Sequence, residues 1–202
     1  MQNGLTATRS SRVPHMGFGG SLCLLIALIV AILGVAARAQ GAKPSVDQVQ
    51  AAYLYNFGKF VKWPASAAAN ESGAFIVCVL NPDPFGDTLQ AVLAGETIAG
   101  KPVVVKRLAK AQDAVACHVL FIGADRARDL PGILSSINEA AVLTVSDMPD
   151  FSKRGGMIQF VMEGNRIRFE INLAGAEKSR LVFPSDLLKV AVAVHRAARP
   201  GE

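Results

Sequence analysis

Apolar and polar residues alternate with a helical period in the segment 47–63. Apolar side chains recur there every three or four residues, which predicts an amphipathic helix with one stripe facing a core, formed by Val49, Tyr53, Phe57 and Phe60. Either Ser45 or Asp47 is suited to cap the start of this helix, and Pro64 is expected to end it.

Four apolar runs bounded by turn residues follow, and they predict buried strands over 74–81, 101–108, 117–123 and 141–147. Helical patterns separate several of these runs, at 87–95 and 126–140. Buried strands that alternate with helices favour parallel pairing, with helices on both faces of the sheet.

The pattern changes near the C-terminus. Two β-rich runs within 155–173 meet at Glu163-Gly164-Asn165, which predicts an antiparallel hairpin. The segment 184–198 then predicts a closing helix with Ser185 at its start. The fold class predicted is α/β: a three-layer Rossmann-like sandwich with a mixed sheet, mostly parallel, plus a C-terminal antiparallel hairpin.

The first 39 residues have the features of a secretory signal peptide. Arg9 and Arg12 precede an apolar run over 21–37, and Ala37-Arg38-Ala39 forms a small-residue cleavage pattern. We therefore expect residues 1–39 to be removed and residues 40–202 to form a single exported domain. The alternative is an uncleaved membrane anchor, because the apolar run is close to the roughly 20 residues that span a bilayer.

Removal of this leader changes the charge and leaves two cysteines. The leader holds three of the 21 basic residues and none of the 16 acidic ones, so the formal charge falls from +5 to about +2. A nucleic-acid partner is therefore not expected. Cys78 and Cys117 form a candidate disulfide pair in an oxidising compartment, and two buried free thiols are the alternative.

Catalytic and cofactor motifs are missing from the predicted mature sequence. It contains no G-x-G-x-x-G, P-loop, G-x-S-x-G or H-E-x-x-H pattern, so we expect neither an enzyme nor a cofactor. His118 follows Cys117 on a predicted strand, where neighbours point to opposite faces, so no metal site is expected. His195 is placed near the end of the predicted last helix, with a structural role.

Two groups of residues remain as candidate sites. Carboxylates near the ends of predicted strands, at the edge where α/β sheets bind ligands, are candidates for small-molecule binding, although aspartate in such loops also caps helices and forms turns: Asp83, Asp87 and Asp147. Aromatic side chains outside the buried stripe of the first helix, with a lysine between them, are candidates for a dimer or partner surface: Tyr55, Lys59 and Trp63.

Three stretches read together resemble the YfiR family of exported bacterial proteins. They are "AAYLYNFGKFVKWP", "VCVLNPDPFG" and "GGMIQFVMEGNRIRFEINLAGAEKSRLVFPSDLLKVA", and the resemblance runs from about Val46 to the end of the predicted last helix.

The resemblance implies a periplasmic signalling repressor, often a homodimer. It would bind the periplasmic sensor region of an inner-membrane diguanylate cyclase, lower cyclic-di-GMP and restrain biofilm growth, and an outer-membrane lipoprotein would sequester it. The resemblance also covers domains fused to sensor kinases or encoded beside other signalling proteins, so regulation of a sensor histidine kinase, or a role as a periplasmic small-molecule-binding sensor module, is the alternative function.

The resemblance also bears on the cysteines. Cys78 and Cys117 match the positions of a family disulfide that supports the folded, active repressor. Some members carry a second cysteine pair in the later half, and this chain has no cysteine after Cys117. Redox switching through a second pair is therefore not expected in this protein.

Overall fold

The computed structural model describes residues 43–65 and 73–196. The chain divides into two compact units, Met1–Lys43 and Pro44–Glu202, and the described helices and strands all belong to the second. The predicted signal peptide, 1–39, lies outside the described residues. Within the described ranges, no helix combines the length and the apolar character needed to cross a membrane.

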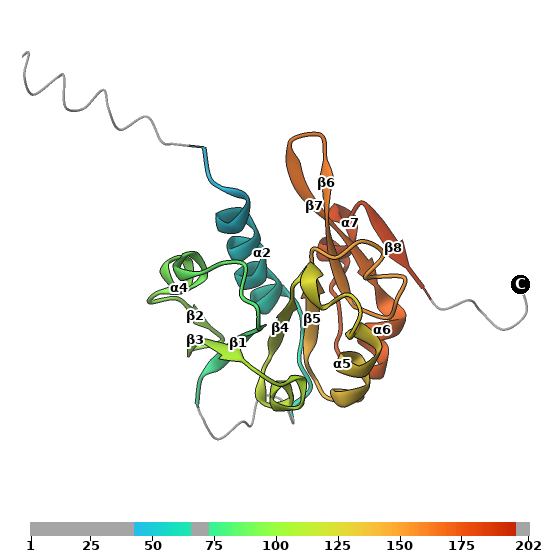
Figure 1. Cartoon of the computed structure of the whole chain (residues 1–202), viewed down its shortest axis with the longest axis horizontal. Helices are drawn as coiled ribbons and strands as arrows, with labels where there is room; N and C mark the ends of the chain where they lie inside the picture. Colours follow the sequence, from blue (N-terminus) through green and yellow to red (C-terminus); the bar gives the residue numbers. More distant parts are fainter. Residues whose placement is uncertain (1–42, 66–72, 197–202) are drawn as a thin grey trace, which may run out of the picture. The chain divides into compact units, whose positions relative to one another are not determined.

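An eight-stranded sheet forms the centre of the domain, in the order β2-β3-β1-β4-β5-β6-β7-β8 (Figure 1). Most neighbouring strands are parallel; β2 with β3 and β6 with β7 are antiparallel. The predicted mixed, mostly parallel sheet with its C-terminal hairpin is confirmed. The strands are β1 (Phe75–Leu80), β2 (Thr97–Ile98), β3 (Lys101–Leu108), β4 (Val119–Ile122), β5 (Leu143–Ser146), β6 (Ile158–Glu163), β7 (Arg166–Asn172) and β8 (Ala193–His195).

Helices cover both faces of this sheet, so buried side chains form two clusters. On one face, α2 (Val46–Phe60) and α4 (Asp87–Leu93) pack against alternate residues of the strands, such as Val77 and Phe121. On the other face, the 3-10 helix η1 (Ala111–Ala116) and helix α5 (Leu130–Ser136) cover Leu120 and its neighbours. The remaining helical elements are the 3-10 helix η2 (Ala124–Arg126), α6 (Leu173–Lys178) and α7 (Ser185–Val190).

Helix α2 is present as predicted, but its buried side differs from the predicted stripe. Phe57 is buried, Val49 and Tyr53 are half-buried, and Phe60 is 52% exposed, so its predicted place in the core was wrong. The most deeply buried positions of the helix are Ala51, Leu54 and Phe57. A Cβ on Gly58 would lie 2.6 Å from the Ile98 side chain, so the small residue lets the helix approach the sheet on this side.

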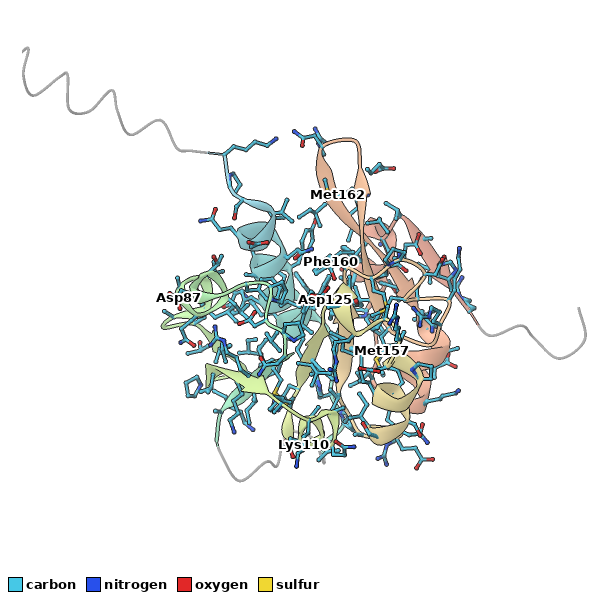
Figure 2. The ribbon with its side chains drawn as sticks, viewed as in Figure 1. Asp87, Lys110, Asp125, Met157, Phe160 and Met162 are labelled. Atoms are coloured by element: carbon cyan, nitrogen blue, oxygen red, sulfur yellow. A yellow bond between two sulfur atoms is a disulfide. The ribbon has the colours of Figure 1, made fainter. Side chains whose placement is uncertain are left out.

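The hairpin is confirmed, with Phe160 paired to Phe169 and the turn at Gly164. Figure 2 shows Phe160 and Met162 on this hairpin, Met162 nearer to its tip.

The predicted closing helix over 184–198 is present only in its first part, and its predicted extent was wrong. Helix α7 ends at Val190, and the chain continues into β8, which pairs in parallel with β7. The segment 190–194 alternates valine with alanine, a pattern suited to a pleated strand. The backbone N–H of Val192 donates to the Phe169 carbonyl at 2.9 Å, so pairing with an existing strand overrides the helical pattern. Neither α6 nor the short strand β2 was predicted from the sequence.

Candidate functional site

The end of α2 brings together the three residues predicted to edge a partner surface. Lys59 lies one turn after Tyr55, and its Nζ is 5.1 Å from the Tyr55 ring centroid, within range of a cation–π interaction. The Tyr55 hydroxyl donates to the Thr97 carbonyl at 3.3 Å. A hydrogen bond with the Glu96 carboxylate is the main cause that raises the pKa of the Tyr55 phenol. Tyr55 is therefore tied to the β2 segment.

Trp63 lies just beyond the end of α2 and packs edge-on against Phe75, with ring centroids 5.3 Å apart. Both Tyr55 and Trp63 are half-buried and pack against the core, while Lys59 is exposed. The three residues thus form a ridge that combines core packing with exposed edges.

A cavity of about 410 Å³ opens beside this ridge, between the end of α2, the start of β1 and the β2–β3 turn. Lys59 and Trp63 line it together with His118, and its apolar wall includes Val61, Phe75 and Ile98. No local pattern in the sequence indicates this cavity, because its walls come from four separate segments of the chain.

His118 is a buried histidine that joins two strands. Its Nδ1 accepts a hydrogen bond from the Ile76 backbone N–H at 3.0 Å, and its own backbone N–H donates to the Ile76 carbonyl at 2.9 Å. The ring stacks on Phe75 with centroids 4.3 Å apart. The structural role predicted for His118 agrees with this arrangement.

Cys78 and Cys117 form a disulfide bond that spans 39 positions of the chain. Cys78 is on β1 and fully buried; Cys117 directly follows η1 and is 5% exposed. The bond fastens η1 to the sheet on the face covered by α5.

Each of the three candidate aspartates has its own local surroundings near a strand end or helix start. Asp83 pairs with the Arg107 guanidinium at 2.7 Å and accepts from the Phe85 N–H at 2.8 Å, as a turn-forming aspartate does. Asp87 is in the first turn of α4, away from Asp125 in the 3-10 helix η2 after β4 (Figure 2).

Asp147, after β5, accepts a hydrogen bond from the Ala124 N–H at 3.2 Å. Desolvation of its carboxyl raises the pKa of Asp147, hydrogen bonds from its own N–H and that of Ala124 oppose the shift, and the charges of Asp125 and Asp47 add to it. This edge therefore gathers negative charge, and the nearby cation Arg107 is already paired with Asp83.

A polar cluster on the hairpin was not predicted. Glu170 accepts from the Ser152 hydroxyl at 3.0 Å, and its Oε2 also lies 3.0 Å from Nε2 of His195. His195 is thus on β8 beside a carboxylate, and its predicted place at the end of a helix was wrong. The polar–apolar alternation of the hairpin predicted Glu170 on its polar face. Its partner His195 could not be predicted, because strand β8 was not predicted.

The order of groups in this cluster matters for its chemistry. A hydrolase triad places the histidine between the serine and the carboxylate, so that the imidazole takes the hydroxyl proton. In this cluster the carboxylate lies between Ser152 and His195, so the imidazole does not contact the hydroxyl. The cluster is suited to holding β8 on the sheet.

Metal binding also finds no support in the residues that the structure describes. Within 43–65 and 73–196, no group of three or more histidine, cysteine, aspartate or glutamate side chains is placed to hold an ion.

The described residues form a disulfide-bonded α/β domain. The chain belongs to the YfiR/HmsC-like family, whose sequence profile matches residues 47–192. This family consists generally of non-catalytic regulators of cyclic-di-GMP systems.

Two solved structures are similar to parts of the chain. A conserved domain protein from Vibrio cholerae O1 biovar eltor matches with a TM-score of 0.47 and 12% identity, over 64% of this chain and 58% of that one. The ABC domain in complex with L-Trp from Streptococcus pneumonia matches with a TM-score of 0.43 and 12% identity, over 63% and 59%. At TM-scores below 0.5, these likenesses support no conclusion about this chain.

Proposed function

We propose that this protein is an exported periplasmic repressor that binds the periplasmic sensor region of an inner-membrane diguanylate cyclase and lowers cyclic-di-GMP. The observation that carries the proposal is the family match over residues 47–192, which covers nearly all of the described domain. Two further observations support it. The disulfide is consistent with an oxidising compartment, and the Ser152–Glu170–His195 order does not favour nucleophilic catalysis.

Repression through contact requires a difference in affinity. A repressor shifts the cyclase toward its inactive state only if it binds that state more tightly than the active one, since equal affinity for both shifts no equilibrium. The surface proposed for this contact is the ridge of Tyr55, Lys59 and Trp63, extended by Phe60. Phe60 is 52% exposed, and aromatic side chains are enriched at protein interfaces.

The function is tested by measuring cellular cyclic-di-GMP in the native host with this gene deleted, and again after complementation. We expect the level to rise on deletion and to return on complementation. An unchanged level would contradict repression of a cyclase and direct attention to a sensor histidine kinase as the partner.

The surface is tested by complementing the same strain with Lys59→Glu and Phe60→Ala together. Both side chains are exposed, so we expect normal export and folding, with cyclic-di-GMP as high as in the deletion strain. Lys106→Glu, an exposed change on β3, is the matched control and should complement fully. Full complementation by the double variant would rule out this surface.

Assembly is part of the same proposal. We propose a homodimer and sequestration by an outer-membrane lipoprotein, both supported by the family. Light scattering of the purified protein should give twice the monomer mass; a monomeric mass across the working concentration range would refute the dimer.

A further inference from the structure

A second cavity opens between α5 and α6, which lie side by side at the end of the sheet where β5 and β6 begin (Figure 1). Its volume of about 420 Å³ lies within the range of ligand pockets, roughly 300–1,000 Å³. Ile137, Val142 and Met157 are buried and give it an apolar floor, and the half-buried Leu134 adds an apolar wall. Such a lining suits a ligand with an apolar body.

The wall formed by α6 is held close to the segment before β6. A Cβ on Gly175, in the first turn of α6, would be 3.2 Å from the Gly155 carbonyl oxygen and 3.3 Å from Met157 Cγ. Asn172 joins the same two segments. Its side-chain amide donates to the Gly156 carbonyl at 3.0 Å, and its side-chain oxygen accepts from the Gly175 N–H at 3.3 Å. This wall is therefore organised in the absence of a ligand, which lowers the cost of binding.

Thr144 supplies an unused donor in the cavity. The residue is 1% exposed, it lines the cavity, and its side-chain oxygen accepts from the Met157 N–H at 3.1 Å. Within the described ranges, no group accepts the hydroxyl proton of Thr144. A buried donor without an acceptor costs free energy, so an acceptor atom of a bound molecule would relieve that cost.

Positive charge exceeds negative charge around the cavity. Arg154, before β6, and Lys178, at the end of α6, both line it, and Glu139 is the one acid among the described residues that do so. Lys178 and Glu139 also border an adjoining recess, where Arg180 adds a third cation. Three cations thus surround one carboxylate, a balance that favours an anionic ligand.

The charges of Arg154 and Lys178 are not neutralised by the protein. The Arg154 guanidinium donates to the Ala127 carbonyl at 2.6 Å and to Met148 Sδ at 3.3 Å, and both acceptors are neutral. No carboxylate in the described part of the chain forms an ion pair with Arg154 or with Lys178. An anion that approaches these cations therefore displaces no acidic side chain.

We propose that this cavity binds a small aromatic carboxylate. The carboxylate accepts from the Thr144 hydroxyl and is attracted by Arg154 and Lys178. The ring packs between Leu134 and Met157, whose thioether makes favourable contacts with aromatic rings. The candidate aspartates of the strand ends do not line this site, and the proposal does not rest on the proposed function.

Methionine methyl groups make the site observable by NMR. Met157 lines the cavity, whereas Met162 is near the tip of the hairpin (Figure 2). The purified protein, labelled with ¹³C at its methionine methyl groups, is titrated with 3-phenylpropionate and, separately, with the neutral 3-phenylpropanamide. We expect a saturable shift of the Met157 signal with the acid, an unchanged Met162 signal, and about tenfold weaker binding of the amide, since hydrogen bonds to charged groups are stronger.

Three results of these titrations would overturn the proposal. The first is the absence of a saturable shift of Met157 up to about 10 mM acid, a concentration that would detect even millimolar binding. The second is equal affinity for the acid and the amide, because the cations would then make no distinction between them. The third is a saturable shift of Met162 without one of Met157, which would place the ligand on the hairpin.

Two charge variants should change the affinity in opposite directions. Lys178→Gln removes a cation and Glu139→Gln removes the acid, and both side chains are exposed, so we expect both variants to fold normally. Lys178→Gln should bind the acid about fivefold more weakly and Glu139→Gln about twofold more tightly, with amide binding unchanged in both. Weaker binding of the acid by Glu139→Gln would show that the site selects a cationic group and would overturn the proposal.

Lys106→Gln is the matched control, since this exposed lysine is on β3 and does not line the cavity. It should bind the acid like the unmodified protein. Unchanged affinity in both Lys178→Gln and Glu139→Gln would place the ligand elsewhere and overturn the proposal. The titrations need no partner protein, so their failure is distinct from failure of the repressor function.

Discussion

Gly156 lies directly against the ring of Phe151, a fully buried residue of the core. A Cβ built on Gly156 would be 2.1 Å from Phe151 Cε1, a distance at which the ring or the backbone must shift. The Gly156 carbonyl also accepts from the Asn172 side chain at 3.0 Å, which limits how far the backbone can move.

We therefore predict that Gly156→Ala lowers the free energy of unfolding by about 2 kcal/mol or more, as overpacking of a dense core does. Urea denaturation measures the effect. The control is Gly132→Ala in α5, where a Cβ meets nothing within 4 Å; it should raise stability by about 0.5–1 kcal/mol because alanine favours helix. A free energy of unfolding for Gly156→Ala that is no lower than that of the unmodified protein would contradict this packing.

Asp147 carries a prediction about pH. Its pKa is raised above 3.8, chiefly by desolvation, so the folded protein binds this proton more tightly than the unfolded chain does. The stability this proton contributes is present below pH 3.8 and is lost as pH rises through the raised folded-state pKa.

Asp147→Asn keeps an oxygen for the Ala124 N–H and removes the ionisation. We expect it to be more stable than the unmodified protein at pH 7, with the advantage shrinking toward pH 3. Chemical denaturation at both values measures the two differences, and an advantage that does not depend on pH would refute the role of this carboxyl.

At the scale of elements, α2 shows what the sequence determines and what it leaves open. The helical period was predicted, with Ser45 or Asp47 as the cap, and the structure has Ser45 in a capping box with Gln48. The buried side could not be read from the aromatic residues alone, because small residues decide where two elements approach closely. Gly58 and Ala51 turn Leu54 toward the sheet and leave Phe60 at the surface.

The difference in burial between Leu54 and Phe60 should appear as a difference in stability between their alanine variants. Leu54→Ala should cost about 2–5 kcal/mol, as deletions from a packed core do, while Phe60→Ala should change stability by less than about 1 kcal/mol. Thermal or urea unfolding of the two variants compares them directly. A larger loss of stability for Phe60→Ala than for Leu54→Ala would instead support the buried stripe predicted from the sequence.

Strand β8 could not have been predicted from local pattern. The valine–alanine alternation after Lys189 is compatible with helix or strand, and the choice depends on the free edge of β7, formed far earlier in the chain. The contact of Glu170 with His195 and the cavity beside Trp63 were not predicted for the same reason. Each combines residues that are distant in sequence.

At the scale of the whole molecule, the disulfide is the main covalent constraint. A closed loop of 39 residues corresponds to about 4 kcal/mol in the chain-entropy model. We predict that Cys78→Ala together with Cys117→Ala lowers the melting temperature by roughly 8–16 °C, given about 2–4 °C per kcal/mol for a domain of this size. Calorimetry of the double variant tests this, with the single tryptophan as a check on folding. A shift of less than about 2 °C would contradict a stabilising role for the bond.

The predicted fold class was confirmed because the apolar runs and their turn residues are locally encoded. The candidate site was predicted only in part. The sequence pattern predicted Tyr55, Lys59 and Trp63, and Lys59 contacts Tyr55 in α2. Of the aspartates predicted from strand ends, Asp83 forms a local turn, Asp87 is in the first turn of α4, and Asp147 accepts from the distant Ala124 N–H.

The burial of the Cys78–Cys117 bond has a further consequence for how the protein meets its surroundings. Thiol–disulfide exchange needs an attacking thiolate to reach a sulfur atom, and these two residues are 0% and 5% exposed. The bond is therefore expected to form as the chain folds and to stay closed to reductants afterwards unless the η1 segment opens. The oxidised state of the bond is therefore set by the compartment in which the protein folds. We expect later changes in the redox potential of the surroundings to leave the bond of the folded protein intact.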